Sequence, residues 1–186
     1  MQARVVWNTA GSWADDDLQI FQPFPSPQFF EGGHKAQANM NELETGIITI
    51  ADDTGGELGE PRYFTLMWND GGADMDGAIW RVHCVDGYVP LGDVVFGHED
   101  AYPYPLQDTV RCVRNDTASP CTFGARVWTD VGTGAEKDVS IWAIRPNNTQ
   151  LSTFFMSSNN HSTPPTNTPW CLNNNNRNTV LTPQNK

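Results

Sequence analysis

Short apolar runs that alternate with polar positions dominate the chain, and they predict β-strands rather than helices. The clearest run is VSIWAI, in which Val139 and Ile141 fall on one face and Trp142 and Ile144 on the other, the period of two that a strand requires. Gly and Pro recur too often for long helices. Only the window 34–46 tolerates a helical turn or two. The pattern therefore predicts an all-β fold.

One motif occurs three times along the chain. Each copy begins with a Trp, has a Gly four residues later, and places an Asp three residues before an Ile–aromatic pair. The copies are WNTAGSWADDDLQIF (7–21), WNDGGADMDGAIW (68–80) and WTDVGTGAEKDVSIW (128–142). A fixed period of about 60 residues is typical of a repeat architecture. We predict a single domain of three repeats, about 1–60, 61–121 and 122–176, with a polar C-terminal tail.

Each repeat is predicted to contain four strands. The first ends on the Trp, and the second carries the Ile–aromatic pair. The third runs through Leu91–Phe96 and Leu151–Met156, with Gln28–Phe30 as the best counterpart in the first copy, and the fourth lies within 46–53, 109–116 and 168–175. The tail either frays or adds an edge strand at Thr179–Leu181.

Each copy presents an apolar face that it cannot bury alone, so the three are expected to close on one another. We predict a pseudo-threefold β-prism whose walls are three sheets. A β-trefoil and a β-sandwich are the alternatives; a repeat of about 60 residues is long for a trefoil.

The charge of the chain excludes some partners. The 186 residues include 22 acidic and 11 basic side chains, which give a net charge of −11. Nucleic acid is not expected, because Lys and Arg supply most of the affinity for phosphates. No apolar stretch reaches the length of a transmembrane helix. The start of the chain lacks the apolar core of a signal peptide, so we expect a cytoplasmic protein, or an extracellular one if a leader has been removed.

Four cysteines carry no spacing typical of a zinc site. They allow three disulfide connectivities, which the sequence does not separate. A local bridge between Cys112 and Cys121 across the turn-rich RNDTASP segment is one hypothesis. Buried free thiols are the other.

The loops that follow the repeated Trp residues are candidate metal sites. They contain Asp70 and Asp76 in the second copy, and Asp130 and Asp138 in the third. Carboxylates and loop carbonyls are ligands that Ca²⁺ takes in sets of 6–8. The favoured interpretation is structural, however, with Asp76 and Asp138 accepting backbone N–H bonds in turns.

Exposed aromatic rings are candidates for ligand binding. The repeated Trp residues end strands at equivalent places and are expected in the core. Trp13, Trp170, Tyr102 and Tyr104 depart from the repeat pattern, and are therefore the predicted binding residues. The His residues share no ligand spacing, and no nucleophile elbow, P-loop or dinucleotide fingerprint occurs. We therefore expect a protein that is not an enzyme.

Further motifs in the second copy identify a family. An aromatic–Arg pair, GY, LGDV and VRCV follow the Trp and Asp positions in order (residues 80–81, 87–88, 91–94 and 110–113), and the third copy matches again between 128 and 146. In these residues the chain resembles the vacuolar protein sorting-associated protein 62 family. Two departures are the degenerate first copy and Val82–Cys84, where the family has a Pro.

The resemblance implies recognition rather than chemistry. Repeats similar to these form adaptor-binding regions of vacuolar sorting lipid-transfer proteins, and related threefold β-prisms occur as lectins and as targeting domains of pore-forming proteins. We expect a non-enzymatic, lectin-like module that binds a glycan, with calcium as a candidate participant. The alternative is a protein- or membrane-targeting module, such as an adaptor-binding domain or the receptor-binding part of a pore-forming or defence protein.

Overall fold

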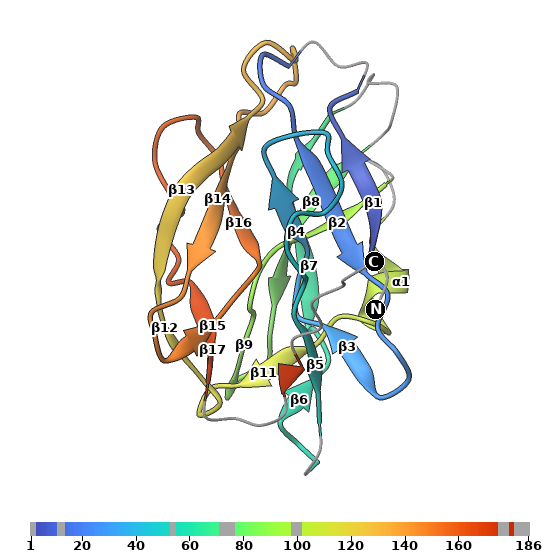
Figure 1. Ribbon diagram of the computed structural model, residues 1–186, viewed down its shortest axis with the longest axis vertical. Coiled ribbons are helices and arrows are strands. Elements are labelled where there is room, and N and C mark those ends of the chain that lie inside the picture. Colours follow the sequence, from blue (N-terminus) through green and yellow to red (C-terminus); the bar gives the residue numbers. More distant parts are fainter. Residues whose placement is uncertain are drawn as a thin grey trace.

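The structure, a computed structural model, is built of short strands and confirms the all-β prediction (Figure 1). It describes residues 3–10, 14–52, 55–70, 77–97, 102–174 and 179–180. Within these residues the strands form six three-stranded sheets, two for each predicted repeat, and every strand pair in them is antiparallel. Whether they make up a β-prism stays a prediction.

The first sheet of each repeat contains the hairpin that follows the repeated Trp. These sheets are β1 (Ala3–Asn8), β2 (Gln19–Pro23) and β4 (Lys35–Gln37); β7 (Tyr63–Asn69), β8 (Ala78–His83) and β10 (Val94–Phe96); and β13 (Thr122–Thr129), β14 (Ser140–Arg145) and β16 (Phe155–Ser158). The second strand lies in the middle of each sheet. Their alternating or fully apolar sequences suit a sheet with at least one buried face.

The second sheets link each repeat to the next. They are β3 (Phe29–Glu31), β5 (Thr49–Ala51) and β18 (Thr179–Val180); β6 (Leu58–Gly59), β9 (Tyr88–Val89) and β11 (Cys112–Arg114); and β12 (Ala118–Pro120), β15 (Gln150–Leu151) and β17 (Trp170–Asn173). The strand β6 follows repeat 1 but pairs with β11, and β12 follows repeat 2 but pairs with β17. The C-terminal β18 then pairs with β5. The edge strand predicted in the tail is confirmed, and it joins the end of the chain to the first repeat.

Three Trp side chains form the centre of the core. Trp7, Trp68 and Trp128 are at most 2% exposed. Their ring centroids lie 5.4, 5.6 and 5.8 Å apart, and each pair of rings meets edge to face, an arrangement that the aromatic quadrupole favours. The prediction that the repeated Trp residues lie in the core is confirmed.

The Trp N–H groups connect the repeats in a cycle. Trp7 Nε1 donates to Asp70 Oδ2 at 2.6 Å, and Trp68 Nε1 donates to Asp130 Oδ2 at 2.9 Å. Trp128 Nε1 closes the cycle by donating to the backbone oxygen of Asp16 at 3.0 Å. Each repeat thus supplies the acceptor for the Trp of the preceding one, which gives every buried indole the partner it needs.

The predicted third strand is confirmed only in part. Phe29–Phe30 lies in β3 and Val94–Phe96 forms β10, but residues 91–93 form no strand. In repeat 3 the predicted strand is divided between β15 and β16, which belong to different sheets. Gly92 lies just before β10, where the chain changes from one sheet to the other. A Cβ on Gly92 would lie 2.6 Å from Phe154 Cβ and 3.0 Å from the backbone oxygen of Phe155. The chain therefore passes through a tight interior contact where continuous strand pairing is interrupted.

The predicted bridge between Cys112 and Cys121 is wrong, and so is the prediction of free thiols. Cys84 is bonded to Cys112 across 28 residues, and Cys121 to Cys171 across 50. Cys112 and Cys171 lie on β11 and β17, the middle strands of their sheets. Each bridge therefore holds that strand to the hairpin of its own repeat, rather than closing the local turn.

Helices contribute little to the fold. The described part of the chain contains one helix, α1 (Tyr104–Gln107), which the sequence did not predict. The window 34–46 forms β4 and bends rather than a helical turn. No helix among the described residues is long and apolar enough to cross a membrane.

The substitution Asp70→Asn tests the cycle of Trp contacts. Asp70 Oδ2 accepts the Trp7 N–H, and Oδ1 accepts the Gly77 N–H at 2.7 Å. In the Asn variant the side-chain NH₂ group replaces one of these two oxygens, so one N–H donor would point at another donor. We expect the free energy of unfolding, measured by urea denaturation, to fall by about 1–3 kcal/mol. The matched control is Asp138→Asn, at a side chain that is 64% exposed, with an expected change of at most about 0.5 kcal/mol. Equal losses in the two variants would contradict this role.

Removal of each disulfide tests its contribution to stability. We expect the double variants Cys84→Ala/Cys112→Ala and Cys121→Ala/Cys171→Ala each to lose about 2–4 kcal/mol of unfolding free energy. The loss should be slightly larger for the bridge that spans 50 residues, because it closes the longer loop in the unfolded chain. Urea denaturation of both variants beside the oxidised protein gives the comparison. Unchanged midpoints would show that these bonds do not stabilise the fold.

Candidate binding surface

The described parts of the β1–β2 and β13–β14 loops lie together at one end of the molecule, the upper end in Figure 1. Trp68 reaches Asp130 in the β13–β14 loop, and Trp128 reaches Asp16 in the β1–β2 loop. The two loops also touch directly, because Asp15 N donates to the Val131 oxygen at 3.3 Å. Segments more than 100 residues apart thus form one surface.

Local turn chemistry shapes the β13–β14 loop. Gly132 and Gly134 adopt φ values of 89° and 77°, a left-handed conformation that glycine enters without steric cost. Between them, the backbone N–H and the hydroxyl of Thr133 both donate to the backbone oxygen of Asp130, at 3.0 and 2.8 Å. The Thr133 hydroxyl also accepts the Ala135 N–H. The loop is therefore held in one shape by its own polar groups.

The Asp130 carboxylate accepts hydrogen bonds from three residues at this surface. Its side chain is 3% exposed and accepts from Trp68 Nε1 through Oδ2 and from Val139 N through Oδ1, both at 2.9 Å. In repeat 2, Asp70 accepts the equivalent pair of bonds, from Trp7 and Gly77. Asp130 also accepts a bond from His161 Nε2 at 2.7 Å. A second loop is thereby tied to the first in repeat 3.

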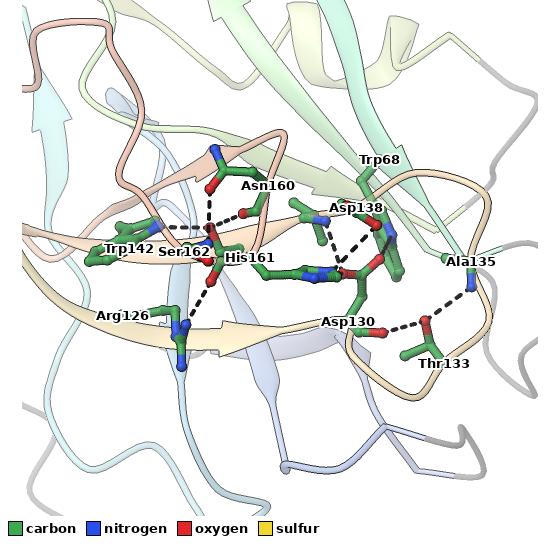
Figure 2. Close-up of polar contacts among 12 residues, drawn as sticks. Trp68, Arg126, Asp130, Thr133, Ala135, Asp138, Trp142, Asn160, His161 and Ser162 are labelled. Carbon is green, nitrogen blue, oxygen red and sulfur yellow. Dashed lines mark hydrogen bonds and ion pairs between the residues drawn. The ribbon is translucent and has the colours of Figure 1, made fainter.

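His161 lies between a buried and an exposed carboxylate (Figure 2). It comes from the β16–β17 connection, its side chain is 33% exposed, and Nε2 lies 3.6 Å from Asp138 Oδ1 as well as 2.7 Å from Asp130. Because a carboxylate only accepts hydrogen bonds, Nε2 carries the hydrogen. The imidazole is therefore fixed in orientation while one side of it meets solvent.

The backbone around His161 is held equally firmly. Asn160 Oδ1 accepts the Ser162 and Thr163 N–H groups at 2.9 and 2.7 Å, and its amide donates to Ser158 Oγ at 2.8 Å. Arg126 Nη1 donates to the His161 oxygen at 2.6 Å. These bonds preorganise the loop, which lowers the entropy that binding would cost.

We name the repeat-3 loop site after the residues that converge there. It consists of Asp130, Val131, Asp138, Asn160 and His161. Val131 is 41% exposed and Asp138 is 64% exposed. The site thus offers a carboxylate, an imidazole and apolar methyl groups on a fixed scaffold, which suits a ligand that carries both hydroxyl groups and an apolar face.

The structure describes three of the four predicted metal ligands. Asp70 and Asp130 are buried, and N–H groups point at both oxygens of each. Asp138 is exposed, and Asp76 lies outside the described residues. No group of three or more His, Cys, Asp or Glu side chains in the described ranges could hold a metal ion. The calcium hypothesis stays a prediction, and a cation at Asp70 or Asp130 would have to displace N–H donors.

Three of the four predicted aromatic residues, Tyr102, Tyr104 and Trp170, belong to segments apart from the repeat-3 loop site. Tyr102 packs against Phe64 and Trp80, with ring centroids at 5.9 and 5.8 Å, and its hydroxyl accepts the Phe64 N–H. Tyr104, on α1, is 68% exposed. Trp170 is half-buried on β17, on the opposite side of the view from α1 (Figure 1). Trp13 lies outside the described residues. Of this set, Tyr104 offers the most open ring.

Sequence reasoning missed His161. It lies 31 residues from Asp130 in the chain, and no spacing rule connects the two. The contact depends on how the β16–β17 connection folds back over its repeat, which local patterns do not encode.

Comparison with known proteins gives one solved structure and one family. The crystal structure of GNIP1Aa from Chromobacterium piscinae is similar to this chain with a TM-score of 0.78 and 28% identity, over 92% of this chain and 36% of that one. The chain therefore corresponds to about a third of that protein. No curated protein matches the chain.

Both the structural likeness and the family fit a β-rich binding module. The model of the vacuolar protein sorting-associated protein 62 family (Vps62) matches residues 1–186. Among the Trp, Asp and aromatic positions that suggested this family, Trp68, Asp70, Trp80, Trp128 and Asp130 are buried. The chain belongs to the Vps62 family.

Proposed function

We propose that this chain is a non-enzymatic recognition module that binds a glycan at the repeat-3 loop site. The observation that carries the proposal is the fixed His161 beside Asp130 and Asp138, at 2.7 and 3.6 Å. Binding sites need polar groups held in place by buried partners, because ordering them at the time of binding costs free energy. Asp130 supplies that support from the core.

The chemistry of the site suits a sugar. The Asp138 carboxylate can accept hydrogen bonds from hydroxyl groups, and the imidazole can also form hydrogen bonds to them. The Val131 methyl groups can contact an apolar sugar face. Tyr104 offers a second, separate stacking surface. Calcium remains part of the proposal only through the exposed oxygens of the loop, since the oxygens of Asp130 already accept N–H bonds.

A recognition role is supported by the partners of His161. An Asp–His pair becomes catalytic when the imidazole activates a nucleophile. Among the described residues, no Ser, Thr or Cys side chain is hydrogen-bonded to the His161 ring. We propose that its task is to bind rather than to transfer a proton.

The second candidate function is targeting to a protein or membrane receptor. It is favoured by the likeness to GNIP1Aa, of whose chain this module corresponds to 36%, because a module within a larger protein commonly directs the remainder to its target. Liposome flotation and pull-down with candidate receptors test this alternative separately from glycan binding.

The variant His161→Ala tests the proposed site on a glycan array, with and without a chelator. We expect the wild-type protein to bind at least one glycan class, and His161→Ala to bind it about tenfold more weakly, the effect of losing one good hydrogen bond. A loss of signal in chelator would show that calcium takes part.

The matched control is His83→Ala, at a partly exposed His that stacks on Tyr63 at 4.3 Å between ring centroids and belongs to β8 in repeat 2. We expect it to bind as the wild type does. If the wild type binds no glycan in either condition, or if the two variants lose binding equally, the proposed site is wrong.

A further inference from the structure

We infer that His34 makes its contact with Val95, one of the contacts between repeats 1 and 2, selectively sensitive to acid: a proton on its Nδ1 breaks this bond, while the corresponding bonds at the other two junctions persist. This property concerns the body of the fold and does not depend on glycan binding.

His34 joins the two repeats through its ring. It is fully buried, and Nδ1 accepts the Val95 N–H of β10 at 2.9 Å. Nε2 lies 3.0 Å from Glu31 Oε2. A backbone amide is always a donor, so Nδ1 carries no hydrogen and Nε2 donates to Glu31. The ring is therefore neutral when the junction is closed.

Glu31 is the charged group that faces this ring from β3. It also accepts Gln22 Nε2 at 2.9 Å, and Gln22 in turn accepts from Arg4. Burial raises the pKa of Glu31, but hydrogen bonds from His34 and Gln22 outweigh it and hold that pKa below the usual 4.5. Glu31 thus stays ionised in mild acid.

Asp93 is the other charged group at this junction, immediately before β10. Its backbone oxygen accepts the His34 N–H at 3.1 Å, whereas its carboxylate is bonded to Arg81 through both oxygens at 3.0 Å. The Asp93 carboxylate is therefore engaged away from the His34 ring. Glu31 remains the one carboxylate among the described residues that is hydrogen-bonded to this imidazole.

Acid acts on the open state of the junction. A proton on Nδ1 would point at the Val95 N–H, so the closed junction excludes it. Once Val95 moves away, Nδ1 can take up a proton, and the charged ring pairs with Glu31. One proton taken up on opening raises the opening equilibrium by up to about tenfold per pH unit. The contact with Val95 therefore weakens as the pH falls.

The other two junctions use acceptors that behave differently. Between repeats 2 and 3, Ser157 N donates to Asp93 Oδ2 at 2.7 Å, and the same carboxylate oxygen accepts from Arg81. Between repeats 1 and 3, Ile48 N donates to the Thr153 hydroxyl at 3.0 Å, which does not titrate in this range. The three junctions therefore provide an internal comparison.

Amide hydrogen exchange measured by NMR at pH 7 and pH 5, corrected for intrinsic rates, tests the inference on the intact chain. We expect protection of the Val95 amide to fall about tenfold or more, and that of Ser157 and Ile48 to change less than about twofold. A parallel fall at all three amides, or no fall at Val95, would overturn it.

The variant His34→Asn separates titration from packing, because its Oδ1 can accept the Val95 N–H at every pH. We expect the pH effect to vanish in this variant and to persist in the control His83→Asn. Should His34→Asn fail to fold, ¹⁵N shifts of the wild-type ring decide: a hydrogen on Nδ1 at pH 7 overturns the inference, and a bare Nδ1 supports it.

Discussion

Three buried indole N–H groups impose the constraint from which the arrangement of repeats follows. The three indoles of Trp7, Trp68 and Trp128 are buried, so water does not reach their N–H groups. A buried donor without a partner costs about 1–3 kcal/mol. Each N–H finds its acceptor in another repeat. The apolar contact and the polar requirement are satisfied together only when the repeats are arranged in cyclic order, and the exchanged strands of the second sheets reinforce that order.

The same constraint places the candidate site. Asp130 must be buried, and aimed at Trp68, to serve the core, so its remaining lone pairs lie at the base of a surface loop. His161 uses one of them. The site is therefore held by the core rather than by its own surface bonds alone, and a change at Asp130 cannot separate binding from stability. A change at His161 can, because Trp68 and Val139 still satisfy Asp130.

The sequence predicted what repetition and period encode: an all-β chain, the strands around each Trp, and their burial. It failed where the fold joins residues by contacts that no local pattern records. Leu91–Phe96 has the composition of one strand, yet only Val94–Phe96 forms one, because the chain at Gly92 packs tightly against Phe154. Cys112 lies closer in sequence to Cys121 than to Cys84, yet pairs with Cys84, because sheet position decides which sulfur atoms meet. His161 belongs to the same class.

Differences between the copies carry the information that repetition cannot. Asp70 and Asp130 each accept a loop N–H, whereas in repeat 1 the hydroxyl of Thr9 accepts the corresponding Leu18 N–H at 3.0 Å. The indole of Trp128 donates to a backbone oxygen of repeat 1 rather than to a carboxylate. Where one junction uses the carboxylate of Asp93, another uses His34. A fold needs only some acceptor at each of these places, so selection for folding leaves its identity open. The imidazole acceptor of His34, and the Asp130 carboxylate that holds a second loop, are the positions at which a repeat is free to acquire a function of its own.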